Sequence, residues 1–156
     1  MMRQITIAVR CAALILTIVA CAGDGPLSPG FARDVASARA RWTQRGSADY
    51  TVESRVLCFC PSHMRFWSRL TVRGGAVVAA EFAEPVPSVY MESLLGWSTV
   101  EEVFSAAASA SRDSIVRQLT GRFDAELGYP LEMAISCRQT ALDCGVTYQM
   151  RNLRLQ

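Results

Sequence analysis

The residues with the clearest chemical potential are Cys58, Cys60 and His63, which fall within the hexapeptide CFCPSH. Two thiolates and an imidazole are soft ligands that suit Cu(I) or zinc, and two neighbouring thiols can also exchange electrons as a disulfide. The C-x-C-x-x-H spacing matches neither zinc ribbons nor the C-x-x-C-H haem attachment sequence, and no second cluster completes four ligands. We therefore favour a structural role for the two cysteines, with thiol-redox exchange or metal binding as the alternative.

Other catalytic patterns are sparse. His63 is the sole histidine and no G-x-S-x-G turn occurs, so a Ser-His-Asp or Cys-His arrangement would have to recruit that one residue. Glu101 and Glu102 are adjacent on a predicted helix and point in different directions, which favours capping and solvation over an acid/base pair. Asp124 and Glu126 flank a predicted turn, where aspartate commonly bonds its own backbone rather than a cation. The sequence therefore predicts no enzyme and no cofactor.

The first 20 residues, MMRQITIAVRCAALILTIVA, have the pattern of a signal peptide, because Arg3 and Arg10 lie ahead of an apolar run that ends in a small residue. Ile18-Val19-Ala20-Cys21 then resembles a bacterial lipobox, in which Cys21 would be acylated and become the new N-terminus. Residues 21–30 are rich in Gly, Pro and Ser and indicate a flexible tether. We expect a lipid-anchored domain at a bacterial membrane, in the cell envelope and outside the cytoplasm.

The charge balance argues against a nucleic-acid partner. The chain has sixteen basic and fourteen acidic residues, and removal of residues 1–20 takes away Arg3 and Arg10, which leaves fourteen of each. Nucleic-acid binding calls for a clustered basic face. Apart from the membrane reached through the N-terminal lipid, we expect the partner to be an unknown envelope protein or component.

Aromatic residues suggest where such a partner would bind. Trp67, Trp97, Tyr90 and Tyr129 could form an exposed patch, although aromatic residues are usually part of the core. Tyr90 and Trp97 fall within residues 85–98, the longest stretch without a predicted element, and long loops often carry binding residues. These two are the candidate binding residues.

The length of the chain after the tether, about 125 residues, predicts one domain with a single core over residues 31–156. Apolar residues at helical spacing predict helices over 31–42 and 99–111, and Ser98 with Glu101 fits a capping box for the second. Alternation predicts strands over 50–60, 65–73, 76–82, 115–123, 131–137 and 146–153, with a hairpin turn at Gly74-Gly75. The expected fold class is α+β: a mostly antiparallel sheet with two helices packed on one face, in the order α-βββ-α-βββ.

Several motifs are spread over the chain that follows the tether. They are Trp42 and Tyr50 around a glycine, Cys58-Phe59-Cys60-Pro61, Thr71-Val72-Arg73-Gly74-Gly75, Phe104, and Phe123-Asp124-Ala125-Glu126-Leu127-Gly128-Tyr129-Pro130. Together they resemble a bacterial exported lipoprotein family known only as a domain of unknown function, the 6174 family. The resemblance implies a small, often lipid-anchored, exported domain with no assigned activity.

Four cysteines remain if Cys11 leaves with the signal peptide and Cys21 takes lipid. An oxidising compartment favours disulfides among Cys58, Cys60, Cys137 and Cys144, and three pairings are possible. We favour Cys137 with Cys144, because they end two facing strands where neighbours lie about 4.5 to 5.5 Å apart, and closing that loop would contribute about 2 to 2.5 kcal/mol.

Cys58 and Cys60 are a less obvious pair. Residues two apart on a strand stand about 6.5 Å apart, near the limit for a disulfide, although a bend at Pro61 could close the gap. The family's CFC motif commonly occurs without the later cysteines, which implies that Cys58 and Cys60 pair with each other.

Overall fold

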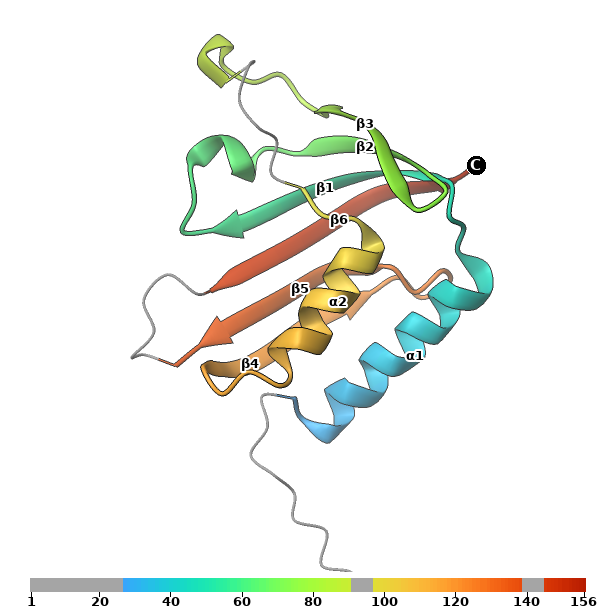
Figure 1. The fold of residues 1–156 in the computed structure, drawn as a ribbon, viewed down its shortest axis with the longest axis vertical. Helices are drawn as coiled ribbons and strands as arrows, with labels where there is room; N and C mark the ends of the chain where they lie inside the picture. Colours follow the sequence, from blue (N-terminus) through green and yellow to red (C-terminus); the bar gives the residue numbers. More distant parts are fainter. Residues whose placement is uncertain (1–26, 91–96, 139–144) are drawn as a thin grey trace, which may run out of the picture.

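The computed structural model describes residues 27–90, 97–138 and 145–156, and Figure 1 shows their arrangement. The predicted signal peptide, Cys21 and most of the tether lie outside these residues. The elements follow one another as α1 (Pro29–Arg45), β1 (Tyr50–Cys58), η1 (Ser62–Arg65), β2 (Ser68–Arg73), β3 (Ala76–Phe82), η2 (Ser88–Tyr90), α2 (Val100–Ala110), β4 (Val116–Phe123), β5 (Pro130–Cys137) and β6 (Val146–Leu155). The predicted order α-βββ-α-βββ is confirmed. No helix among the described residues has the length and apolar character needed to cross a membrane.

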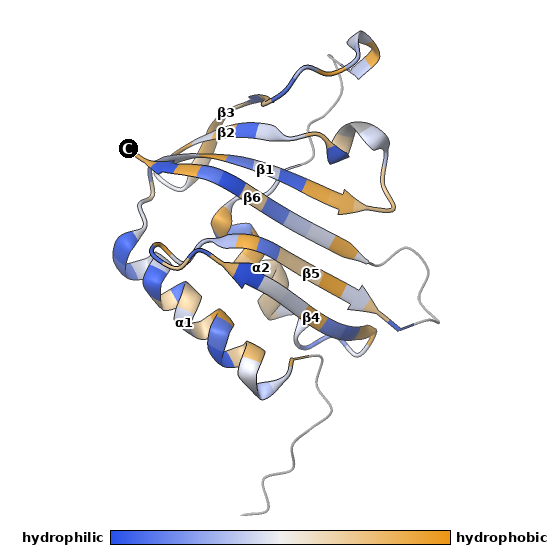
Figure 2. Cartoon of the chain, turned by 180° about the vertical axis from the view of Figure 1, so that it is seen from behind, coloured by the Kyte–Doolittle hydropathy of each residue, from blue (hydrophilic) through white to orange (hydrophobic). Residues whose placement is uncertain are grey.

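The six strands form one antiparallel sheet in the order β3-β2-β1-β6-β5-β4. Phe123 of β4 stacks with Phe31 of α1 and with Phe104 of α2, so both helices pack on the same face of the sheet. Seen from behind in Figure 2, none of the described helices covers the other face of the sheet. The predicted α+β class, with two helices on one face of an antiparallel sheet, is therefore correct.

Capping residues set where the helices begin. The Ser28 hydroxyl accepts a hydrogen bond from the Phe31 N–H of α1 at 3.2 Å. For α2 the capping box consists of Thr99 and Glu102, one residue later than the predicted pair of Ser98 and Glu101.

The shift of the capping box has a tertiary cause. Both backbone groups of Ser98 bind Ser54 of β1: the Ser54 hydroxyl donates to the Ser98 carbonyl at 2.9 Å and accepts from the Ser98 N–H at 3.1 Å. Ser98 is therefore tied to the sheet, and Thr99 caps the helix. The same shift leaves Glu101 free to make tertiary contacts.

The first two strands are shorter than predicted. β1 ends at Cys58 instead of Cys60, and β2 begins at Ser68 instead of Arg65, because Pro61 is followed by the short helix η1. The predicted Gly74-Gly75 turn joins β2 to β3, with positive φ angles of 56° and 78° at its two glycines. Two successive residues in this conformation form the type I′ turn that suits a tight hairpin.

On the open face of the sheet, the carboxylate of Glu53 is almost buried, with 8% of its surface exposed. It accepts hydrogen bonds from Arg69 at 3.1 Å, Arg151 at 2.7 Å and Asn152 at 3.0 Å. Burial by itself would raise the pKa of this carboxyl, but the hydrogen bonds from the two guanidinium groups and from Asn152 hold the pKa below its ordinary value. Glu53 thus joins β1 to both neighbouring strands.

Trp67 lies beneath two arginines on the same face. The guanidinium of Arg55 is 4.4 Å from the centre of the Trp67 ring, and that of Arg151 is 4.0 Å from it. Both distances are within the range of a cation–π interaction. The open face is therefore held together by polar and aromatic contacts between strands instead of by a packed layer of helices.

Candidate functional site

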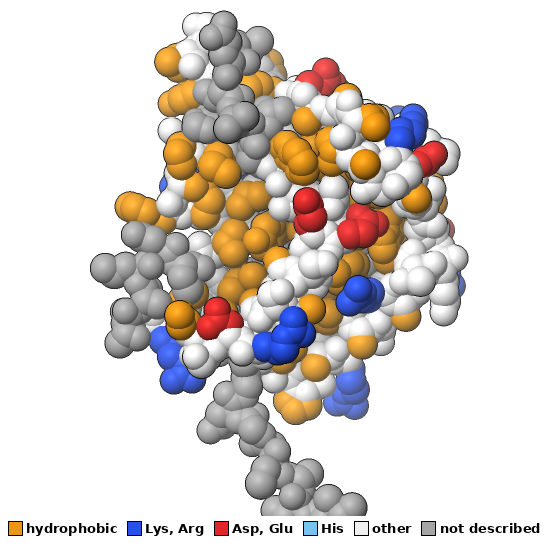
Figure 3. All heavy atoms as spheres, viewed as in Figure 1, with side chains coloured by type: hydrophobic (Ala, Val, Ile, Leu, Met, Phe, Trp, Pro, Cys, Tyr) orange, Lys and Arg blue, Asp and Glu red, His pale blue; other side chains and the backbone are white. Residues whose placement is uncertain are grey.

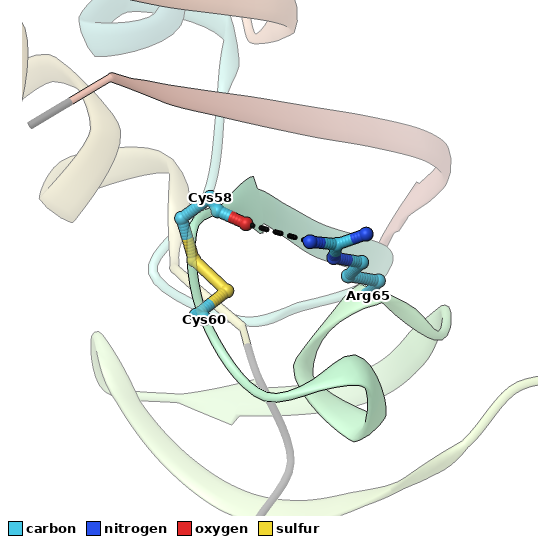
Figure 4. Close-up of a disulfide and its surroundings, with 3 residues drawn as sticks. All are labelled: Cys58, Cys60 and Arg65. Atoms are coloured by element: carbon cyan, nitrogen blue, oxygen red, sulfur yellow. Dashed lines mark hydrogen bonds between the residues drawn. A yellow bond between two sulfur atoms is a disulfide. The ribbon is translucent and has the colours of Figure 1, made fainter. Parts of the chain in front are cut away.

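Cys58 and Cys60 form a disulfide at the end of β1, with their Cα atoms 5.1 Å apart (Figure 4). The pairing implied by the CFC motif is therefore present. Cys60 lies beyond the end of the strand, so the separation of about 6.5 Å expected for residues i and i+2 of a strand does not apply. Arg65 of η1 donates a hydrogen bond to the Cys58 carbonyl at 3.2 Å and holds η1 against the loop.

The disulfide also bears on the metal hypothesis. The backbone of His63 lies in η1, three residues beyond Cys60. With both sulfur atoms bonded to each other, neither is a thiolate, which is the form that ligates zinc or Cu(I). Within the described ranges, no group of three or more His, Cys, Asp or Glu side chains is placed to hold a metal ion. A metal site at Cys58, Cys60 and His63 would require reduction of the disulfide first.

Two of the other predicted cysteines lie outside the part of the chain that the structure describes. These are Cys21, the predicted lipidation site, and Cys144, the predicted partner of Cys137. Cys137 closes β5 and is itself disulfide-bonded.

The four aromatic residues that could form a patch do not share one exposed surface. Trp67 and Tyr129 are buried, which agrees with the alternative that aromatic residues belong to the core. Trp97 is half-buried and packs against the hydrophobic core. Tyr90 of η2 lies beside η1, because its hydroxyl is 3.4 Å from the Ser62 hydroxyl and its ring centre is 5.6 Å from that of Phe66. Of the two candidate binding residues, only Tyr90 is placed next to the disulfide loop and η1.

Phe59 is the residue that the sequence analysis missed. Its side chain is 80% exposed, the highest value among the large hydrophobic residues described, and Val89 of η2 follows at 75%. The side chain between the two joined cysteines is therefore in solvent. An aromatic residue between two cysteines that pair with each other is thus a sequence signal for an exposed ring. We call Phe59, Val89 and Tyr90 the disulfide-end surface.

The other end of β1 carries a second feature that the sequence did not reveal. One carboxylate oxygen of Glu101 accepts a hydrogen bond from the Trp42 indole at 3.0 Å, and the other accepts one from the Tyr50 hydroxyl at 2.9 Å. The Tyr50 hydroxyl also accepts a bond from the Val100 N–H at 3.2 Å. Glu101 therefore joins α1, α2 and β1. Its side chain is exposed, as expected for a solvated residue, but the residue that caps the helix is Glu102 and not Glu101.

The electrostatics of this network follow from its position. Burial, and then the negative charge of Glu101, raise the pKa of the Tyr50 phenol well above its ordinary value. Glu101 lies in the first turn of α2, where the partial positive charge of the helix N-terminus favours a carboxylate. The indole of Trp42 meets the Tyr50 ring edge to face, with ring centres 5.3 Å apart. The Tyr50 phenol thus stays neutral within this network.

The turn between β4 and β5 has a structural explanation. The Asp124 carboxylate accepts hydrogen bonds from the N–H groups of Glu126 at 3.0 Å and Leu127 at 2.7 Å, so the prediction that it bonds its own backbone is confirmed. Gly128 has a φ of 83°, and a Cβ there would stand 2.2 Å from the Ala38 carbonyl oxygen of α1. The turn therefore needs glycine in order to pack against α1.

The fold and the loop define an α+β domain with one helix-covered face and a disulfide-closed apolar loop at one end of its sheet. The chain belongs to a family of unknown function, DUF6174, whose family model matches residues 34–155. This match confirms the family suggested by the sequence motifs. No curated protein and no solved structure matches the chain.

Proposed function

We propose that this protein is a non-enzymatic, lipid-anchored domain of the bacterial cell envelope that binds another envelope protein or component through its disulfide-end surface. The observation that supports this proposal most is the 80% exposure of Phe59 on a loop that a disulfide closes. The match to a family of unknown function is compatible with this role and assigns no activity.

The energetics of Phe59 favour a contact role. Burying a phenylalanine side chain is worth about 1.5 to 3 kcal/mol relative to leaving it exposed, so the free protein forgoes that stabilisation. Aromatic residues are enriched at protein interfaces and often dominate their binding energy. The Cys58–Cys60 disulfide fixes the loop before binding, which lowers the entropy lost when a partner docks. Exposure and preorganisation together are typical of a binding anchor.

The location is supported by sequence and by chemistry. Cys21 follows a lipobox-like sequence, and disulfides persist mainly in oxidising compartments, such as the bacterial periplasm. A single acyl chain binds membranes weakly, whereas the two or three chains of a lipoprotein hold firmly. We expect Cys21→Ser to abolish acylation and to move the protein out of the membrane fraction. Wild-type protein without acyl mass at Cys21 would contradict the anchoring part of the proposal.

A crosslinking experiment tests the contact surface. A photoreactive amino acid is placed at position 59 in the full chain expressed in cells, and a matched control carries it at position 78, since Val78 of β3 is 60% exposed and lies away from the loop. We expect one discrete adduct from position 59 and none of that mass from position 78. No adduct at 59, or the same adducts from both positions, would contradict the proposal.

Thiol-disulfide exchange is a second candidate function, favoured by the position of the Cys58–Cys60 disulfide on a surface loop. In that reaction a partner dithiol would reduce this disulfide and become oxidised itself. Equilibration of the folded protein with glutathione buffers of known ratio measures the potential. An exchange role predicts reversible reduction at about −180 mV or higher, as in oxidising disulfide-exchange proteins, whereas a structural disulfide resists reduction to below about −300 mV.

A further inference from the structure

A hollow of about 440 Å³ lies beside the Glu101 network, at the end of β1 opposite the disulfide loop. It is bounded by the C-terminal half of α1, the first half of α2 and the hairpin turn at Gly75. Its volume is within the range of small-molecule sites. This hollow lies outside the proposed contact surface and is independent of it.

The lining of the hollow combines chemical groups of three kinds. Trp42 and Phe104 contribute the small exposed parts of rings that are otherwise buried, Arg39 and Glu101 supply one charge of each sign, and hydroxyl groups come from Thr43, Ser47 and Ser105. An apolar wall with a few converging polar groups is the usual composition of a ligand site. Figure 3 shows acidic side chains gathered at the start of α2, with a basic side chain nearby towards α1.

Arg39 and Glu101 do not form an ion pair with each other. Among the described residues the ion pairs are Arg69 with Glu53, Arg69 with Glu81, and Arg151 with Glu53, so neither Arg39 nor Glu101 is in one. Glu101 is held by two neutral donors, Trp42 and Tyr50, which fix its direction without neutralising its charge. The hollow therefore offers an oriented anion and a separate cation together with the exposed edges of two aromatic rings.

We propose that this hollow binds a small zwitterion with an apolar side chain, such as a free amino acid. The ammonium group of the ligand would pair with Glu101, its carboxylate with Arg39, and its side chain would lie against Trp42 and Phe104. A ligand with one charge leaves either Arg39 or Glu101 without its partner. A hydrogen bond to a charged group contributes about 1.5 to 3 kcal/mol, so each lost pairing weakens binding by about tenfold or more.

The test uses three related probes: leucine, leucinamide, which lacks the carboxylate, and N-acetylleucine, which lacks the ammonium group. The full chain in detergent carries ¹⁵N at its tryptophan indoles, and Trp42→Phe identifies the Trp42 signal. We expect a saturable shift of that signal with leucine and at least tenfold weaker binding of the other two probes. No saturable shift, or equal affinity for all three probes, would overturn the proposal.

Two charge variants and a control assign the contacts. Arg39→Gln should remove the preference for leucine over leucinamide, and the folded protein should tolerate it because Arg39 is exposed and in no ion pair. Glu101→Gln should remove the preference for leucine over N-acetylleucine. Glu126→Gln, an exposed acid of the β4–β5 turn, should leave all three affinities unchanged. An unchanged preference in Arg39→Gln would overturn the proposal even if Glu101→Gln fails to fold.

Discussion

The two ends of β1 differ in how they are held and in what they expose. At Cys58 a covalent disulfide closes the chain onto itself and leaves Phe59 in solvent. At Tyr50 a network of hydrogen bonds around Glu101 buries two aromatic rings and joins three elements. A local covalent ring needs no core to support it and can therefore display an apolar side chain, whereas the Tyr50 end depends on tertiary packing. The Tyr50 end therefore contributes mainly to stability, and we propose that the Cys58 end contributes mainly to contact with a partner.

Truncation of one aromatic residue at each end gives the largest contrast. Trp42→Ala removes a buried ring and the indole donor to Glu101, so we expect a loss of about 3 to 5 kcal/mol in the free energy of unfolding. Phe59→Ala removes an exposed ring and should change it by no more than about 0.5 kcal/mol. Urea unfolding measures both. Similar losses of stability at the two positions would contradict the claim that only the Tyr50 end stabilises the fold.

A smaller change at the Tyr50 end is Tyr50→Phe. It takes a donor from Glu101 and leaves the buried Val100 N–H without an acceptor, which should cost about 1 to 3 kcal/mol. The variant also tests the raised pKa of Tyr50. Because the folded state keeps this phenol protonated, its contribution is present below pH 10 and is lost as pH rises further, since the unfolded phenol ionises first.

The alkaline limb of the stability curve should therefore be shallower in Tyr50→Phe than in the wild-type protein. Tyr129 and Tyr148 also have raised pKa values, so the variant should still lose some stability at high pH. Urea unfolding between pH 8 and pH 11 makes the comparison. Parallel curves for the two proteins would show that Tyr50 is not held protonated by its surroundings.

At the disulfide end, the double variant Cys58→Ser with Cys60→Ser should cost about 1.5 kcal/mol, because the ring spans only three residues and little chain entropy is at stake. Amide hydrogen exchange should accelerate in residues 58–65 and stay unchanged around Trp42. Faster exchange throughout the sheet would contradict a local role for this disulfide. Crosslinking from position 59 should weaken as the loop loses its fixed shape.

Between the two ends, Glu53 gives an effect that depends on pH. Its pKa is lowered in the folded state, so its contribution is present above the ordinary value of 4.5 and is lost as pH falls through the folded pKa. Glu53→Gln should flatten the acid limb of the stability curve below pH 5, with a modest change at pH 7 because Arg69 and Arg151 remain half-exposed to water. Urea unfolding from pH 3 to pH 7 tests this. An unaltered acid limb would show that other carboxyl groups cause the loss of stability at low pH.

How much could be predicted from sequence depended on whether the interaction was local. The element order and the Gly74-Gly75 turn follow from periodicity and from backbone preferences, both of which are local. The cap of α2 was misplaced by one residue because Ser98 is held by Ser54, far away in the chain. The tertiary contacts of Glu101 are not predictable for the same reason, since its partners Trp42 and Tyr50 are more than fifty residues distant.

At the candidate site, too, some features could be predicted from the sequence and others could not. The pairing of Cys58 with Cys60 was suggested by a motif, but the exposure of Phe59 was not, because strand alternation was assumed to continue through residue 60. Only the end of β1 at Cys58 and the closure of the ring place that side chain in solvent. Where a short covalent ring ends a strand, alternation stops being a guide to burial.

The most direct test of the central claim, that the disulfide end displays a contact residue and does no thiol or metal chemistry, is the intact mass of the mature protein extracted from membranes. The mass is measured under denaturing conditions before and after thiol alkylation without reductant. We predict acyl groups on Cys21 and no mass gain on alkylation, since Cys58 and Cys60 are joined. Alkylation of both Cys58 and Cys60 in the unreduced protein would contradict this claim and would favour the thiol or metal hypothesis.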